Sequence, residues 1–501
     1  MIEFIKKNII WIVCILGSIV RLLYGYFYEP WQEAPDQMAW ELIIEQGKFQ
    51  YDHLIHYPHE GGTIVLSLLS HIVELFTDFS SLTVVAFCVD FCFRFIQLKI
   101  VQHVFNLKTA IIFGVWSVFA VPILLPWATV NYGLHAISSV FPFLLLWILT
   151  KKHTSSRAYW SVGISLGLIL WFSYSNIVLI PVFISYVVFR YPKNKQWRFA
   201  VFGFAIVMIF HVLVRMFADA GFHLNEFGIT AIRDVNFSLG DVPILNRLYQ
   251  LPSVIANGAL VLPNETAFYS GMKILYYIFG FIALIGLFFR YRKHEFRKEI
   301  LIISSIILTF FIAYIVSPFF TDSVTGNYVT HRHLTYIMPF VSLLMIVGLT
   351  AVRYHQIVIV FLLLGMVRSF QFFATEKTPH NEIFVKATGM ILGTKFGHDQ
   401  EVLYAILDKN SEDKELLLFG IGWGMSTTLM QDADSLNDDQ IALKIAHLVD
   451  TFFNYSSDER ISIYQGIKFS FSDDVTPRMD KQLFKKIESI INQRAMKSLQ
   501  E

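Results

Sequence analysis

The residues whose types and spacing could support chemistry gather between positions 28 and 62, directly after the first apolar segment of the chain. This stretch contains the acids Glu33 and Asp36 and the histidines His56 and His59. A carboxylate beside a hydroxyl can act as a general base, and carboxylate and imidazole groups together can bind a divalent cation such as Mg²⁺ or Mn²⁺. Asp36, His56 and His59 are therefore candidate metal ligands, although their spacing matches no specific metal motif.

A short helix is expected around Asp36. Pro35 favours the first position of a helix, Asp36 its first turn and Gly47 its end. One face of this helix is apolar and is expected to lie on the membrane surface; it carries Met38, Ala39, Leu42 and Ile43. An acid at the positive end of a helix also has a purely structural explanation, worth about 0.3–1 kcal/mol.

A second candidate group, His331, Arg332 and His333, comes immediately before a late apolar segment. An arginine can hold two phosphate oxygens at once and stays charged, so this group could bind the phosphate of a lipid. Anchoring of the segment in the headgroups is the alternative explanation. Arg215, near the end of an earlier apolar segment, is the next candidate for phosphate binding.

Three further charged residues lie within apolar segments. Asp90 and Arg94 are four positions apart on one helical face and are expected to neutralise each other. Arg21 lies toward the outward end of the first segment, where a long side chain can extend to the headgroups.

The elements that must position these residues are apolar helices. The chain is 55% hydrophobic and 16% charged, whereas about 25% charged residues is usual for a soluble domain. The composition predicts an all-α polytopic membrane protein, and the net charge of +1 gives no indication of a nucleic-acid partner. The candidate spans are 9–27, 61–77, 80–104, 109–130, 132–150, 158–173, 176–190, 199–217, 271–290, 299–318, 334–352 and 356–374.

The distribution of basic residues predicts the orientation of these spans. Lysines and arginines cluster in short connections, such as 290–298, which the positive-inside rule assigns to the cytoplasm. A cytoplasmic N-terminus and an outward tail require an odd number of crossings, about 11, or 13 if two spans have been merged. We expect a multi-pass protein of the bacterial inner membrane, with its site and its tail on the periplasmic or extracellular side.

The chain is expected to divide into a membrane domain, 1–374, and a soluble helical domain, 375–501. Within the tail, residues 411–421 match residues 457–467, and each copy follows an apolar-periodic stretch. Such a period is typical of stacked helical hairpins. The tail could bind a partner or cap the membrane domain.

Three stretches resemble the GT-C superfamily of membrane glycosyltransferases, which includes protein O-mannosyltransferases, lipid A aminoarabinose transferases and oligosaccharyltransferases. PDQMAWELIIEQGKF (35–49) is similar to their first outward loop, HYPHEGGTIVLSLL (56–69) to the Tyr-Pro-x-Gly segment of oligosaccharyltransferases, and THRHLTYIMP (330–339) to the opening of a late span. Gln37 departs from the second acid that many members carry, and the tail lacks the Trp-Trp-Asp motif of oligosaccharyltransferases.

The resemblance implies a GT-C helical bundle in the cell envelope that transfers a sugar from a polyprenyl-phosphate donor to an acceptor on the outward face. Asp36 then matches the catalytic acid, with Glu33 as the substitute, and Arg332 is expected near the donor phosphate. Two alternatives remain open: a transporter or flippase of a lipid-linked substrate, and a non-catalytic GT-C homologue that recruits partners through its tail.

Overall fold

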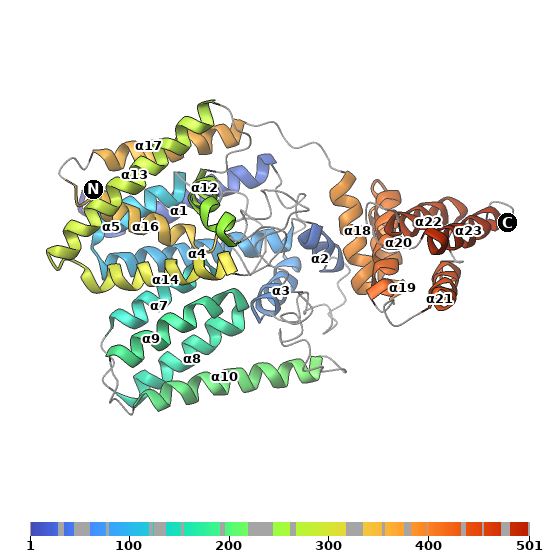
Figure 1. Cartoon of the computed structure of the whole chain (residues 1–501), viewed down its shortest axis with the longest axis horizontal. Coiled ribbons are helices and arrows are strands. Elements are labelled where there is room, and N and C mark those ends of the chain that lie inside the picture. Colours follow the sequence, from blue (N-terminus) through green and yellow to red (C-terminus); the bar gives the residue numbers. More distant parts are fainter. Residues whose placement is uncertain are drawn as a thin grey trace. The chain divides into compact units, whose positions relative to one another are not determined.

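The structure is a computed structural model in which every described element is a helix (Figure 1). No strand occurs among the residues that it describes. The described residues are 2–28, 35–44, 61–76, 80–119, 124, 137–151, 155–190, 196–218, 244–260, 267–316, 334–352, 356–374, 382–397, 399–431, 437–452, 455–471 and 481–498.

The helices divide into two compact units. Unit 1 contains α1 (Ile2–Tyr28), α3 (Gly61–Glu74), α4 (Ser81–Val104), α5 (Leu107–Phe119), η3 (Ile137–Val140), α7 (Phe141–Thr150), α8 (Ser156–Phe172), η4 (Tyr174–Leu179), α9 (Ile180–Arg190), α10 (Trp197–Ala218), α12 (Ile244–Leu260), α13 (Ala267–Arg292), α14 (Arg297–Val316), α16 (Met338–Leu349) and α17 (Ile357–Ala374). Unit 2 contains α2 (Pro35–Ile44), α18 (Glu382–Phe396), α19 (Gln400–Lys409), α20 (Lys414–Gln431), α21 (Asp438–Asp450), α22 (Ser457–Ser470) and α23 (Lys481–Ser498).

Each apolar segment expected between residues 1 and 374 contains a helix. Among the described residues, α13 and α14 are long and apolar enough to cross a membrane by length and composition, and eight further apolar helices are shorter. One helix was not expected: α12 lies within 218–270, which the sequence pattern indicates to be an outward connection.

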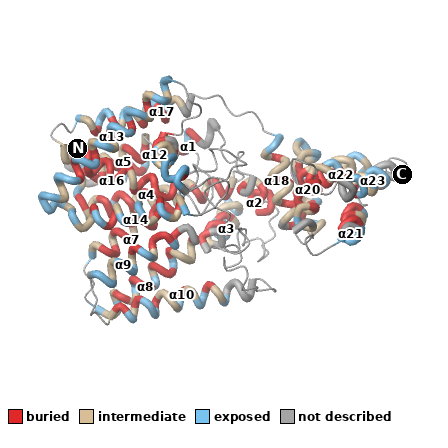
Figure 2. Tube along the Cα trace, viewed as in Figure 1, coloured by how far each residue is buried: buried red, intermediate tan, exposed pale blue. Residues whose placement is uncertain are grey.

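The helices of unit 1 carry both buried and exposed residues along their length (Figure 2). Many of the exposed residues have large apolar side chains. On α13, for example, Tyr276 and Phe279 are buried, whereas Phe281 and Leu284 are about two-thirds exposed. The same pattern recurs on α1, α10, α14 and α17. Contiguous exposed apolar faces of this extent are unusual for a protein that is surrounded by water.

Small residues allow two helix pairs of unit 1 to approach closely. A Cβ atom added at Gly163 of α8 would collide with the main chain of Ala200 on α10. Gly286 of α13 and Gly348 of α16 face each other in the same way. Close crossings at small residues are how helices associate where apolar burial against lipid supplies no net driving force.

Unit 2 contains the repeat as stacked helices. The two matching stretches begin α20 and α22, so Gly420 and Gly466 occupy equivalent positions. A Cβ at Gly420 would collide with the main chain of Lys386 on α18, and one at Gly466 with that of Phe419 on α20. Each repeat therefore packs through the same glycine on the helix two elements earlier, α20 on α18 and α22 on α20. The pairing within the expected hairpins, α19 with α20 and α21 with α22, stays a prediction.

Candidate functional site

The sequence-predicted site residues fall mainly outside the described part of the chain. Asp36 is the second residue of α2, and Arg215 lies in the last turn of α10; the side chains of both are outside the described set. The remaining predicted residues also lie outside it: Glu33, His56, His59, His331, Arg332 and His333. Among the described residues, no cluster of histidine, cysteine and acidic side chains could hold a metal ion. The structure therefore leaves the expected metal site as a prediction.

The short helix that carries Asp36 begins at Pro35, as the sequence predicts. Its apolar face does not lie on a membrane surface, because Ala39, Leu42 and Ile43 are buried where α2 packs against α18 within unit 2. The indole of Trp40 lies 6.1 Å from the ring of Phe396, measured between centroids. The expectation of a membrane-surface helix is wrong: the apolar stripe is covered by another helix of the same protein.

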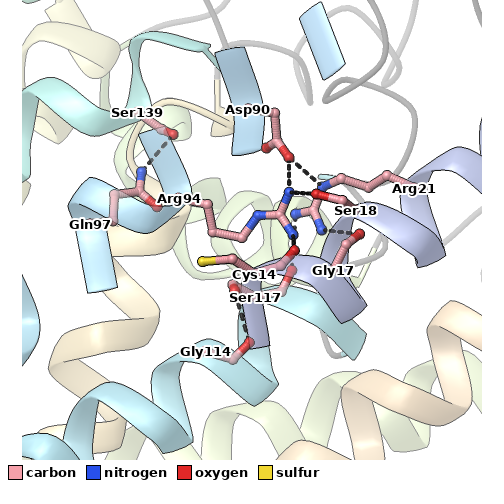
Figure 3. Close-up of polar contacts among 10 residues, drawn as sticks. All are labelled: Cys14, Gly17, Ser18, Arg21, Asp90, Arg94, Gln97, Gly114, Ser117 and Ser139. Carbon is pink, nitrogen blue, oxygen red and sulfur yellow. Dashed lines mark hydrogen bonds and ion pairs between the residues drawn. The ribbon is translucent and has the colours of Figure 1, made fainter. Parts of the chain in front are cut away.

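The described polar constellation lies in unit 1, where α1, α4 and α5 pack together (Figure 3). Asp90 of α4 forms ion pairs at Oδ2 with two guanidinium groups. One belongs to Arg94, a turn further along the same helix, which confirms the predicted pair. The other belongs to Arg21 of α1, whose Nε lies 3.2 Å from the same oxygen.

Arg21 does not extend to the headgroups as expected. Its side chain is 1% exposed, and its Nη2 donates to the main-chain oxygen of Ser117 on α5 at 3.0 Å. Its Nη1 donates to the oxygen of Gly17, one turn earlier on α1. The reason is the acid on the neighbouring helix, because Asp90 offers a partner for a charge that would otherwise seek water.

Arg94 completes a link between α4 and α1. Its Nη1 lies 3.2 Å from the main-chain oxygen of Cys14, and its Nη2 lies 3.3 Å from the hydroxyl of Ser18. Cys14, Ser18 and Arg21 share one face of α1, since they are spaced at four and three positions. That spacing is the sequence signal that could have indicated a polar face on α1 directed at Asp90.

A small cavity of about 20 Å³ adjoins this cluster, lined in part by Asp90, Arg94, Gln97 and Ser139. Gln97 donates to the hydroxyl of Ser139 at 3.1 Å, and the Nε of Arg94 has no hydrogen-bond partner among the described residues. A cavity of this size and polarity can hold about one water molecule.

The cluster of Arg21, Asp90 and Arg94 links three helices and carries one net positive charge. Two guanidinium groups share one carboxylate, and their remaining hydrogen bonds go mostly to main-chain oxygens of α1 and α5. Main-chain oxygens have fixed positions in their helices. The hydrogen bonds to them therefore hold α1, α4 and α5 in one arrangement. The cluster fixes the helix that leads into the acid-rich stretch after residue 28.

Comparison with known proteins found no matching family model, no matching curated protein and no matching solved structure.

Proposed function

We propose that the protein is a polytopic membrane glycosyltransferase of the GT-C kind, which transfers a sugar from a polyprenyl-phosphate donor to an acceptor on the outward face. The observation that carries the proposal is the order α1, then a separate short helix opened by an acid at its second position, then α3. This order matches the first-loop pattern on which the resemblance rests. Asp36 stands at that position.

The membrane location is supported by the exposed faces of unit 1. Large apolar side chains point outward along α1, α10, α13, α14 and α17, and lipid is the solvent that such faces fit. Most of the described charged residues of unit 1 lie near helix ends. Within the bundle, the buried Arg21 and Arg94 pair with Asp90, and the buried Arg368 donates to the main-chain oxygen of Leu260. Paired charges facing the inside of a bundle are the arrangement expected in lipid.

The proposed reaction assigns a role to each site residue. Asp36 accepts the proton of the acceptor hydroxyl, and the oxygen forms a bond to the anomeric carbon of the donor sugar. The bond between that carbon and the phosphate oxygen breaks, and its electron pair leaves with the polyprenyl phosphate. Arg332 stabilises the negative charge that develops on that oxygen, with His331, His333 and Arg215 as neighbouring candidates. No step in this scheme depends on a metal ion.

The packing of α2 gives unit 2 a part in this proposal. Because α2 is buried against α18, the position of Asp36 depends on the tail helices. The tail then acts as the support of the catalytic loop in addition to any contact with a partner.

A direct experiment is transfer of labelled sugar from synthetic polyprenyl-phosphate donors by the purified full chain. We expect wild-type protein to release polyprenyl phosphate and label an acceptor fraction. Arg332→Lys should raise the KM for the donor while the protein still folds, and Arg332→Ala should raise it further, because lysine cannot hold two phosphate oxygens. Unchanged donor use by Arg332→Ala removes this residue from the site.

The second candidate function is a flippase for a lipid-linked substrate. The buried Arg21, Asp90 and Arg94 cluster favours it, because charged residues inside membrane helices often mark substrate pathways. The two functions differ in the product. A flippase moves intact donor across vesicles and depends on Asp90 but not on Asp36, whereas the transferase breaks the sugar–phosphate bond and depends on Asp36.

A further inference from the structure

A groove of about 930 Å³ runs between α9 and α14 in unit 1. It belongs neither to the acid-rich stretch after α1 nor to the cluster of Arg21, Asp90 and Arg94, and the proposed reaction makes no use of it. Its volume is within the range of about 300–1,000 Å³ that is usual for ligand sites.

Most of the length of the groove is apolar and open to the surroundings. Phe189 of α9 is 84% exposed, and Leu308 of α14 is 61% exposed. Val182 and Ile302 form deeper parts of the lining. A surface of this kind is suited to a hydrocarbon chain.

One end of the groove is basic. Arg297 and Lys298 line it where α14 begins. Arg297 is positioned by Tyr291, whose hydroxyl accepts from Nη2 at 2.9 Å, and Lys298 donates from Nζ to the main-chain oxygen of Thr150 at 3.3 Å. The half-buried Glu299 also lines this end.

The turn before α14 carries a net positive charge. Residues 290–299 include five lysines and arginines but two glutamates, so the charge stays positive with Glu299 included. His294 and Phe296 have positive φ angles of 60° and 53°, which fold the connection between α13 and α14 into a tight turn. Of its cations, Arg297 and Lys298 line the groove, whereas Arg290 bonds to Glu295 and Thr350.

The length of the groove fits one leaflet of a bilayer. Its lining on α14 extends from Arg297 to Thr309, which corresponds to about 18 Å at about 1.5 Å per residue. Half of a hydrocarbon core of about 30 Å is about 15 Å. A chain held beside α14 would therefore run from the basic end to about the middle of the bilayer.

We propose that this groove binds an anionic glycerophospholipid, with the phosphate at Arg297 and Lys298 and an acyl chain along α9 and α14. The positive-inside rule places the basic turn on the cytoplasmic side, where anionic lipid headgroups occur. The proposal rests on the membrane location of unit 1 within the proposed function, but not on the transfer reaction or on Asp36.

The test is lipid binding to the purified full chain in detergent, measured by native mass spectrometry with phosphatidylglycerol and phosphatidylcholine of the same acyl chains. We expect wild-type protein to prefer phosphatidylglycerol. Arg297→Gln combined with Lys298→Gln should weaken phosphatidylglycerol binding by about tenfold or more and leave phosphatidylcholine binding nearly unchanged. Ser305→Trp, which fills the apolar part of the groove, should weaken both.

The matched control is Arg292→Gln combined with Lys293→Gln, which removes two charges from the same turn at positions that do not line the groove. The control should change binding by less than about threefold. Equal losses in the two double variants, or no preference for phosphatidylglycerol in wild-type protein, would overturn the proposal. Displacement of phosphatidylglycerol by a lower concentration of polyprenyl phosphate would also overturn it. Because the assay contains no sugar donor, its failure leaves the transferase proposal standing.

Discussion

Arg21 of α1 and Asp90 of α4 form an ion pair, with 3.2 Å between Nε and Oδ2, in the interior of unit 1. Arg94 binds the same carboxylate oxygen, so one acid compensates two arginines. The pair joins the first helix of the chain to the bundle, and the guanidinium of Arg21 reaches a third helix through Ser117. This relationship defines the arrangement of the helix that precedes the proposed catalytic loop.

The charge balance predicts unequal effects of substitutions in the cluster. Asp90→Asn leaves two buried cations without an acid, whereas Arg94→Met leaves a neutral pair of Arg21 and Asp90. Breaking a buried pair by removing one partner costs about 3–5 kcal/mol when a charge is left behind. We expect Asp90→Asn to lower the thermal unfolding midpoint in detergent clearly more than Arg94→Met. Equal midpoints for the two variants would contradict the shared-acid arrangement.

Gly17 should be sensitive to an added methyl group. A Cβ at this position would collide with Nη1 of Arg94, whereas a Cβ at Gly280 of α13 has no heavy atom within 4 Å. Gly17→Ala is expected to destabilise the protein by about 1–3 kcal/mol, and Gly280→Ala to stabilise it by about 0.5–1 kcal/mol through helix propensity. Chemical unfolding in detergent compares the two. An unchanged free energy of unfolding for Gly17→Ala would show that the Arg94 side chain can move away without loss of stability.

Trp40 is expected to hold α2 on the tail helices. It is buried against α18 near Phe396, and truncation of a buried tryptophan typically costs about 3–5 kcal/mol. Trp40→Ala should speed amide hydrogen exchange in α2 and lower the transfer rate at saturating donor. Leu443→Ala, at an exposed position of α21, is the control and should leave both unchanged. If hydrogen exchange in α2 becomes faster while turnover stays normal, the activity of Asp36 does not depend on the packing of α2 against the tail helices.

Much of the helix pattern in residues 1–374 is predictable because long apolar segments with few charged residues are typical of helices. The helix α12 is missed because polar residues and Pro252 interrupt its apolar pattern. The start of α2 follows from Pro35, but its partner does not, since an apolar stripe does not specify whether lipid or protein covers it. The pair of Asp90 and Arg94 is visible as a local spacing; the participation of Arg21 depends on packing between α1 and α4.

The ion pair of Glu459 and Lys414 predicts a pH dependence for unit 2. Burial alone would raise the pKa of Glu459, but hydrogen bonds from Lys414 and from Ser456 together lower it below its ordinary value of 4.5. The unfolded chain therefore takes up the proton at higher pH than the folded chain, and stability falls as pH decreases below about 4.5.

Thermal unfolding of the tail helices as a function of pH measures this effect. Glu459→Gln and Lys414→Gln should each flatten the decrease in stability at acid pH, since each removes the interaction that lowers the pKa. The contribution is expected to be small because Lys414 is about one-third exposed and water screens the pair. If both variants lose stability at acid pH as steeply as the wild-type protein, other carboxylates cause the acid sensitivity.

The most direct test of the central claim is the turnover of Asp36→Asn with labelled polyprenyl-phosphate sugars. Asp439→Asn is the matched control, because Asp439 is also the second residue of a helix in unit 2 and its side chain is 86% exposed. We expect Asp36→Asn to fold normally and to lose about 100-fold or more in kcat, as removal of a general base requires. Asp439→Asn should keep wild-type turnover. Near-normal turnover in Asp36→Asn would contradict the proposal that Asp36 is the general base, and Glu33 would become the candidate.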